Sequence, residues 1–253
     1  MKKFLSWLLG LFSKKTPSNN TKPSEPFEPE QPVGPIPVEP VEPSKQVVKI
    51  ALIVGHTPKA AGAINYKGER EFTFNSRIAA LVEAQIRQQT AQVEVKTFFR
   101  DEGSFAPAVA KVGKAVGDWG AKASLELHFN SFDQPAFGCE VLVWQGANQL
   151  AQTLAFADAM TNRFSQQFGI KQRGQYVDEF GKRFDGVRVL ATQDRGALNL
   201  KACCDNGLGL VLLFEPCFAN VETTESRAVF ENEARYANFI AQELIALAQQ
   251  IQR

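Results

Sequence analysis

Residues 47–54 read VVKIALIV, and this stretch decides the class of fold. A continuous run of aliphatic, largely β-branched residues is typical of a strand that is buried on both faces of its sheet. Further along the chain, short apolar runs alternate with segments of helical spacing. We therefore predict a single α/β domain with a twisted, mostly parallel central sheet that is flanked by helices.

The remaining elements follow from the same two patterns. Strand-like runs occupy residues 93–99, 125–129, 139–144 and 209–214, and helical patterns occupy residues 72–88, 106–119, 149–168 and 223–251. Within residues 172–206, the charges around Lys182 and Arg183 favour a solvated loop or an insertion at the rim of a cleft. In parallel sheets, chemistry collects where the strands end, so the residues after each strand are the first candidates for a site.

The first 46 residues differ in composition from the other 207, because they hold nine of the 13 prolines. Residues 16–46 are rich in Pro and Glu, and most of their prolines recur at every third position. This spacing matches the polyproline II repeat, so we predict a disordered, extended linker, with a ligand for a proline-binding module as the alternative. Residues 47–253 are long enough to bury a complete core as one domain.

Residues 1–15 read MKKFLSWLLGLFSKK, an apolar run between two lysine pairs. The apolar part is far shorter than the roughly 20 residues that a bilayer-spanning helix needs. No small-residue cleavage site follows it, as an ordinary secretory signal would have. We predict a segment for membrane contact or export, with its lysines facing anionic lipid, and a disordered terminus is the alternative.

Charge and cysteine spacing argue against two classes of site. The chain has 28 Lys and Arg against 27 Asp and Glu, a net charge of +1, which excludes a nucleic-acid binder driven by electrostatics. Four cysteines are present, none of them in CxxC spacing, so we expect no metal site built from cysteine. A disulfide stays open if the domain works outside the cytosol.

Both histidines of the chain lie at the ends of predicted strands. His56 follows the first strand, His128 lies near the end of another, and Glu215 closes a third, while Glu71 opens the first long helix. A lone histidine is usually structural, but two at equivalent strand ends favour a metal. Zinc hydrolases use three His or carboxylate ligands, and a further carboxylate can accept a proton. The spacing thus favours a zinc site, with structural histidines as the alternative.

Four short motifs, in order, carry a resemblance to a known family. They are Gly55-His56 with Gly62-Ala63 and Gly68; Glu71 with Asn75 and Ile78-Ala79; His128-Phe129-Asn130; and Glu215 with Phe218 and Asn220. No single motif is specific, but the set resembles the zinc-dependent N-acetylmuramoyl-L-alanine amidases with the type-3 catalytic domain. The resemblance covers residues 47–253, which we predict to be the amidase domain. A phage-type lysis enzyme is one kind of amidase that the resemblance allows.

The resemblance implies one zinc ion, held by His56, Glu71 and His128, with Glu215 as the catalytic base and acid. Glu69 competes for the role of carboxylate ligand. We prefer Glu71, because the Asn and Ile-Ala that follow it then fall in the register of the family.

The resemblance also implies the substrate, which is bacterial peptidoglycan cut between N-acetylmuramic acid and L-alanine of the stem peptide. Asn130 and Arg195 are candidate substrate-binding residues; a turn cap and a structural arginine are the alternatives. Another zinc peptidase of stem peptides, such as a carboxypeptidase, and a non-catalytic muropeptide-binding module remain as other functions. The expected location is the cell envelope, or the wall of a host cell if this is a phage lysis enzyme.

The chain departs from the family pattern at several positions, all of which leave the proposed ligands intact. They are Thr57-Pro58 after the first histidine, Phe72 after the zinc glutamate, Glu126 two residues before the second histidine, and Pro216-Cys217 after Glu215. Glu126 stands where the family commonly has serine. It is either a carboxylate that contacts the ligand histidine from behind or a strand residue that points away from the site.

Overall fold

The computed structural model describes residues 46–132 and 136–253 of the chain. The membrane-contact segment predicted at 1–15, and all but the last residue of the linker predicted at 16–46, lie outside the described residues. Lys45–Arg253 form one compact unit. In the described part of the chain, every helix is too short or too polar to cross a membrane.

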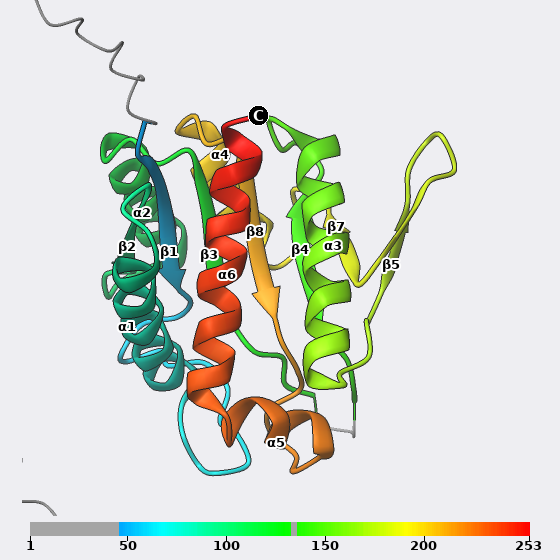
Figure 1. Ribbon diagram of the computed structural model, residues 1–253. Helices are drawn as coiled ribbons and strands as arrows, with labels where there is room; N and C mark the ends of the chain where they lie inside the picture. The colour runs from blue at the N-terminus through cyan, green and yellow to red at the C-terminus, as the bar shows by residue number, and fades with distance from the viewer. Residues whose placement is uncertain (1–45, 133–135) are drawn as a thin grey trace, which may run out of the picture. The chain divides into compact units, whose positions relative to one another are not determined.

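A six-stranded sheet forms the centre of this unit, with strand order β2-β1-β3-β8-β4-β7 (Figure 1). Its strands are β1 (Val48–Val54), β2 (Val93–Phe99), β3 (Ala123–Leu127), β4 (Glu140–Trp144), β7 (Val187–Leu190) and β8 (Leu210–Glu215). All neighbouring pairs are parallel except β4 and β8, which are antiparallel. The predicted α/β class with a mostly parallel central sheet is confirmed.

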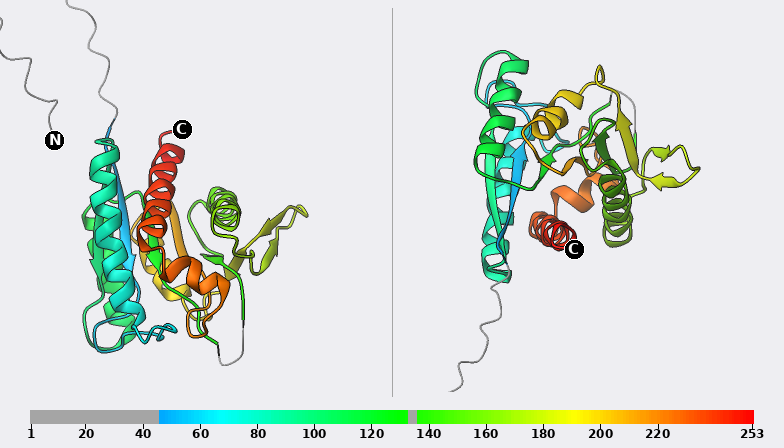
Figure 2. Two further views of the ribbon diagram at one scale, coloured as in Figure 1. Left: turned by 60° about the horizontal axis from the view of Figure 1, so that its bottom comes forward. Right: turned by 90° about the horizontal axis from the view of Figure 1, so that it is seen from above.

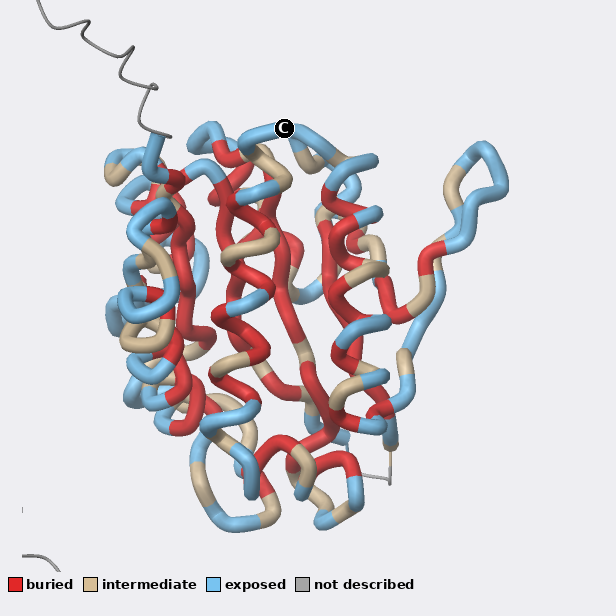
Figure 3. The backbone as a smooth tube through the Cα atoms, in the orientation of Figure 1, coloured by how far each residue is buried: buried red, intermediate tan, exposed pale blue. Residues whose placement is uncertain are grey.

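Helices cover both faces of the sheet, as Figure 2 shows from above. The helices are α1 (Glu71–Gln89), α2 (Phe105–Asp118), α3 (Leu150–Phe168), α4 (Ala197–Asp205), α5 (Thr224–Phe230) and α6 (Glu233–Ile251). Side chains of β1 alternate between two apolar clusters: Ile50 and Leu52 pack with residues of α1, α3 and α6, whereas Ala51 and Ile53 pack with residues of α2 and α4. This double burial explains the continuous apolar run at 47–54, and Figure 3 shows β1, β3 and β8 as buried along most of their length.

Residues 172–206 differ from the prediction of a loop or insertion. Only the hairpin of β5 (Gln175–Val177) and β6 (Arg183–Asp185) stands out from the unit with an exposed tip (Figures 1 and 3). The rest adds β7 to the sheet and α4 to one face, where Leu190 and Leu200 are buried. With four residues, β7 is too short for its alternation to be recognised from sequence.

The single helix predicted at 223–251 is wrong, because the chain forms α5 and α6 with a break between them. Thr223 caps α5 in a capping box with Ser226. Asn232 leaves the helical region, with φ −130° and ψ 47°, and precedes α6 as its N-cap residue. The break turns Phe230 inward, where its ring packs against Phe74 at 4.7 Å between centroids. Burial of this ring outweighs the cost of ending a helix after seven residues.

Candidate active site

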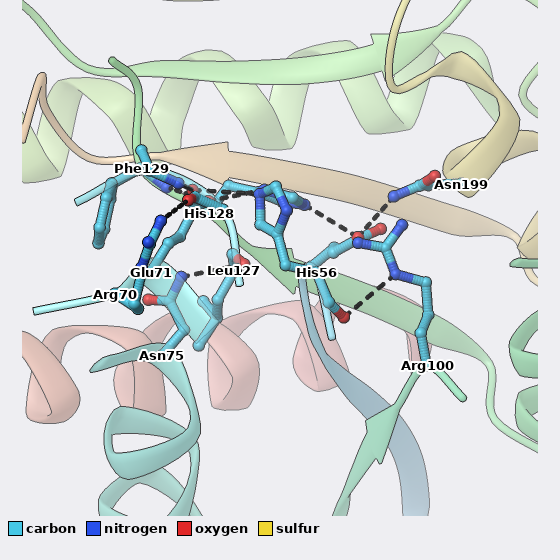
Figure 4. Close-up of polar contacts among 12 residues, drawn as sticks. His56, Arg70, Glu71, Asn75, Arg100, Leu127, His128, Phe129 and Asn199 are labelled. Carbon is cyan, nitrogen blue, oxygen red and sulfur yellow. Dashed lines mark hydrogen bonds and ion pairs between the residues drawn. The ribbon is translucent and has the colours of Figure 1, made fainter. Parts of the chain in front are cut away.

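Two histidines and one glutamate converge where β1 and β3 end and α1 begins (Figure 4). Nδ1 of His128 lies 2.9 Å from Oε1 of Glu71, and Nε2 of His56 lies 3.1 Å from Oε2 of the same carboxylate. One donor atom from each side chain lies within 4.8 Å of the other two, a spacing that could hold a metal ion. The carboxyl ends of adjacent parallel strands thus bring the two histidines of the chain together.

Glu71 is fixed in this cluster by the backbone as well as by the histidines. The amide of Phe129 donates to Oε1 at 3.0 Å, and the amide of Ala63 donates to Oε2 at 3.1 Å. Burial by itself would raise the pKa of Glu71, but hydrogen bonds and charge from His128 and His56 hold it far below its usual range. Glu71 is therefore an ionised, immobile carboxylate, as a metal ligand requires.

Glu69, the competing candidate for the carboxylate ligand, faces another way. Its carboxylate accepts two hydrogen bonds from the Arg77 guanidinium, at 2.5 and 2.9 Å. Arg77 also pairs with Glu233 on α6. Glu69 thus belongs to a partly exposed ion-pair network with Arg77 on α1 and Glu233 on α6, and the clustered carboxylate is that of Glu71.

Backbone features make room for the cluster. A Cβ on Gly55 would lie 2.3 Å from Cε1 of His128, and a Cβ on Gly62 would lie 2.5 Å from Oε2 of Glu71. Gly62 also has a φ of +76°, which glycine adopts without penalty. His56 has a φ of +69°, a conformation that costs a non-glycine residue about 1–3 kcal/mol. Such strain persists at sites where a side chain must point in one direction.

On its other side, the His128 ring meets Glu126. Nε2 lies 2.9 Å from Oε1 of Glu126, which also accepts from Nδ2 of Asn199 at 2.6 Å. Arg100, labelled with Asn199 in Figure 4, donates through Nε to the carbonyl of His56 at 3.4 Å. Burial opposes ionisation of Glu126, but the hydrogen bond from His128 and the charges of His128 and Arg100 lower its pKa overall. Of the two alternatives for Glu126, the structure shows contact with the histidine.

Glu215 ends β8 and has a different environment from the other acids. Burial, opposed by the charge of His128 and aided by the negative charges of Glu71, Glu140 and Glu126, raises its pKa to about 8. Its Oε2 atom is buried and has no hydrogen-bond partner among the described residues. Glu140, the first residue of β4, stands directly opposite it in the antiparallel pair. A carboxyl with such a raised pKa can hold and release a proton near neutral pH.

A cleft of about 770 Å³ joins these groups. The predicted ligands, the predicted base and both predicted substrate-binding residues line it: His56, Glu71, His128, Glu215, Asn130 and Arg195. Nδ2 of Asn130 donates to Oε1 of Glu140 at 2.8 Å, and Arg173 also approaches Glu140, at 3.4 Å. Asn130 therefore orients a neighbouring carboxylate and is more than a turn cap.

The polar residues of this cleft that sequence reasoning missed include Arg100, Glu140 and Asn199. Arg100 directly follows β2, so the rule that sites form at the ends of parallel strands would have found it. Glu140 lies at the start of the one strand that runs against β8, and Asn199 lies on α4, within the region interpreted as a loop. Neither position carries a signal in a single sequence.

The four cysteines are buried free thiols, and none of them lines the cleft. Burial raises the pKa of Cys139 and of Cys203 to about 12. Thiols with such pKa values stay protonated at neutral pH.

Solved structures show where this fold occurs. The catalytic domain of CwlV, an amidase from Bacillus (Paenibacillus) polymyxa var. colistinus, superposes with a TM-score of 0.58 at 20% identity, over 80% of this chain and 99% of that domain. AmiC2 of Nostoc punctiforme gives a TM-score of 0.58 at 19% identity, over 80% of this chain and 97% of that chain. The catalytic domain of the CD27L endolysin gives 0.58 at 16% identity, over 79% and 97%. At these identities, the likeness shows a shared fold.

Family membership rests on sequence. No curated protein matches the chain. The family model for N-acetylmuramoyl-L-alanine amidase matches residues 50–199, more than half of the chain and the part that carries His56, Glu71 and His128. This chain therefore belongs to the N-acetylmuramoyl-L-alanine amidase family.

Proposed function

We propose that this chain is a zinc-dependent amidase, which hydrolyses the amide bond between N-acetylmuramic acid and L-alanine in peptidoglycan. Membership of the amidase family supports the assignment of the bond that is cut. The observation that carries the zinc dependence is the convergence of two imidazoles on one buried carboxylate, with donor atoms within 4.8 Å of one another. Both histidines of the chain belong to this cluster.

The donor set fits zinc. Two imidazole nitrogens and one carboxylate oxygen form one of the ligand sets that catalytic zinc sites use, and such sites keep a fourth position open for water or substrate. Gly55 and Gly62 leave the space around the donors free of side chains. We propose His56, Glu71 and His128 as the ligands. When bound, the ion would supply Lewis acidity toward the scissile carbonyl and lower the pKa of water.

Glu215 supplies the proton chemistry in this proposal. Its carboxylate accepts a proton from the attacking water and delivers it to the nitrogen of the leaving amine, so one group acts first as base and then as acid. Burial makes Glu215 a stronger base than an exposed glutamate, and a cation nearby would shift its pKa back toward neutral pH.

Substrate contacts are proposed for two residues that line the same cleft, Asn130 and Arg195. Asn130 holds Glu140 beside Glu215, and the positive charge of Arg195 suits a carboxylate of the stem peptide. Because peptidoglycan lies outside the cytoplasmic membrane, the chain is proposed to act in the cell envelope, or on a host wall if it is a phage lysis enzyme. Residues 1–15 are proposed to provide export or contact with the membrane surface.

Digestion of purified peptidoglycan, with and without chelator, tests the proposal. We expect new amino termini of L-alanine, one bound zinc per chain, loss of both after chelation and recovery when zinc is restored. Glu215→Gln should bind zinc as tightly as the unaltered chain and cut nothing. Cleavage elsewhere in the stem peptide would instead assign a carboxypeptidase-like reaction. Binding of muropeptides without any cleavage would assign a binding module.

A further inference from the structure

The His128 ring lies between two carboxylates that come from different elements. Oε1 of Glu71, at the start of α1, lies 2.9 Å from Nδ1, and Oε1 of Glu126, on β3, lies 2.9 Å from Nε2. The two ring nitrogens are thus both occupied, one on the side of the proposed zinc ligands and one behind them. Only the first contact belongs to the proposed ligand set.

Burial of the Glu126 carboxylate at its position in the sheet is energetically unfavourable. Glu126 lies in the central strand β3, pairs in register with Ile53 on β1 and Leu213 on β8, and is 3% exposed. Both of those neighbours belong to the apolar cluster that α2 and α4 cover. A carboxylate buried among such residues destabilises the fold by several kcal/mol unless its charge and oxygens are satisfied. A role for the carboxylate is therefore needed to explain its presence.

A hydrogen bond from Asn199 orients this carboxylate, and the charge of Arg100 compensates its negative charge. Asn199, on α4, donates to the same Oε1 atom at 2.6 Å and is itself 7% exposed. The positive charge of Arg100 acts on Glu126, and the Nε atom of Arg100 holds the carbonyl of His56, whose backbone is strained. Arg100 is also 7% exposed, so its charge is poorly screened by water. Behind both histidines there is thus a buried, charge-compensated support.

We propose that Glu126, oriented by Asn199, is a positioning residue for His128. A neutral imidazole carries a single proton, and a carboxylate that accepts from Nε2–H keeps the proton on that nitrogen. A protonated ring donates through Nδ1 to Glu71; in the neutral ring that a metal requires, the lone pair of Nδ1 would instead face the metal-binding position. Partners of this kind fix the orientation of ligand histidines and raise their basicity. This inference rests on the proposed zinc function.

The test measures zinc affinity by competition with a chromophoric chelator in Glu126→Ala and Glu126→Gln. We expect Glu126→Ala to lose roughly 10–100-fold in affinity, as partners behind ligand histidines usually do. Glu126→Gln keeps an oxygen acceptor of the same shape, so its loss of zinc affinity should be several-fold smaller. This variant carries the test if the alanine variant unfolds. In zinc-loaded protein, nitrogen NMR should show Nδ1 of His128 bound to metal and a slowly exchanging Nε2 proton, which exchanges faster in both variants.

Glu243→Ala is the matched control. Glu243, on α6, is also a carboxylate that is 3% exposed, but it pairs with Arg163 on α3, with Nε of Arg163 2.7 Å from its Oε1. This variant should lower stability and leave zinc affinity unchanged. The inference is overturned if both Glu126 variants bind zinc as the unaltered chain does while His128→Ala does not. If the unaltered chain binds no zinc, the proposed function itself fails.

Discussion

Gly55 lies directly against the imidazole of His128, so closely that a methyl group at residue 55 would lie 2.3 Å from Cε1 of the ring. The two residues end neighbouring strands, β1 and β3, which pair in parallel register. The absence of a side chain at one strand end therefore provides the space for the histidine at the other.

We expect Gly55→Ala to displace the His128 ring, because strand backbone cannot yield as a flexible side chain can. Displacement of a site residue by about 1 Å costs roughly 100-fold in rate. The variant should accordingly show at least that loss in amidase activity and a weaker zinc affinity. Gly113→Ala is the control, since its Cβ would lie 2.5 Å from the carbonyl oxygen of Ala202, between α2 and α4. That variant should lose stability while its folded fraction keeps its zinc affinity.

Glu71→Gln and Glu69→Gln form a matched pair two residues apart. Glu71→Gln should lose zinc affinity by more than about 100-fold, a larger effect than that of a partner behind a ligand. Glu69→Gln breaks a partly exposed ion pair with Arg77 and should cost under about 1 kcal/mol of stability, with zinc affinity unchanged. Isothermal titration with zinc and urea denaturation measure the two effects. The reverse pattern would make Glu69 the ligand.

The pH dependence of stability in metal-free protein should change in Glu215→Gln. The folded state keeps the Glu215 proton up to a pKa of about 8, whereas the unfolded chain releases it near its ordinary value of 4.5. The folded state thus binds more protons between these values, so this residue makes stability fall as pH rises. Removing it should make the variant more stable relative to the unaltered chain by roughly 3 kcal/mol on going from pH 5 to pH 7. Urea unfolding at both pH values measures this, and a constant difference between the two proteins would contradict it.

Arg195→Ala should raise KM for peptidoglycan roughly tenfold and leave kcat unchanged, as expected for a contact made equally in ground and transition states. Arg183→Ala, in the β5–β6 hairpin, removes an exposed arginine outside the cleft and should change neither constant. Turnover of labelled peptidoglycan at several substrate concentrations separates the two constants. A fall in kcat at constant KM would place Arg195 in the chemical step instead.

Much of the fold and the centre of the candidate site could be predicted from the sequence, because both depend on strongly patterned strands. β1 and β8 are continuous apolar runs, and the polar residues at their ends, His56 and Glu215, stand out against them. His128 stands out for the same reason at the end of β3. Position in the sheet then follows from the physics of parallel strands, whose carboxyl ends share one edge.

The residues behind the histidines could not be predicted in the same way. Asn199 reaches Glu126 across 73 residues of chain, and its helix begins with a glycine in the left-handed region instead of a polar cap. The break between α5 and α6 depends on burial of Phe230, a tertiary contact that outweighs a sequence with helical spacing throughout. Such long-range packing leaves little trace in local periodicity.

The reversed direction of β4 gives the cleft two walls of different construction. β1, β3 and β8 meet the cleft with their carboxyl ends, which carry the two histidines and Glu215, whereas β4 and β7 meet it with their first residues, which include Glu140 and Arg188. One wall therefore carries the proposed metal ligands and base, and the opposite wall carries the charged side chains of Glu140 and Arg188, which are available for contacts with a substrate. Changes at Arg188 on β7 would alter this wall without touching a proposed metal ligand, whereas changes at Glu140 on β4 would also shift the pKa of Glu215, the proposed base.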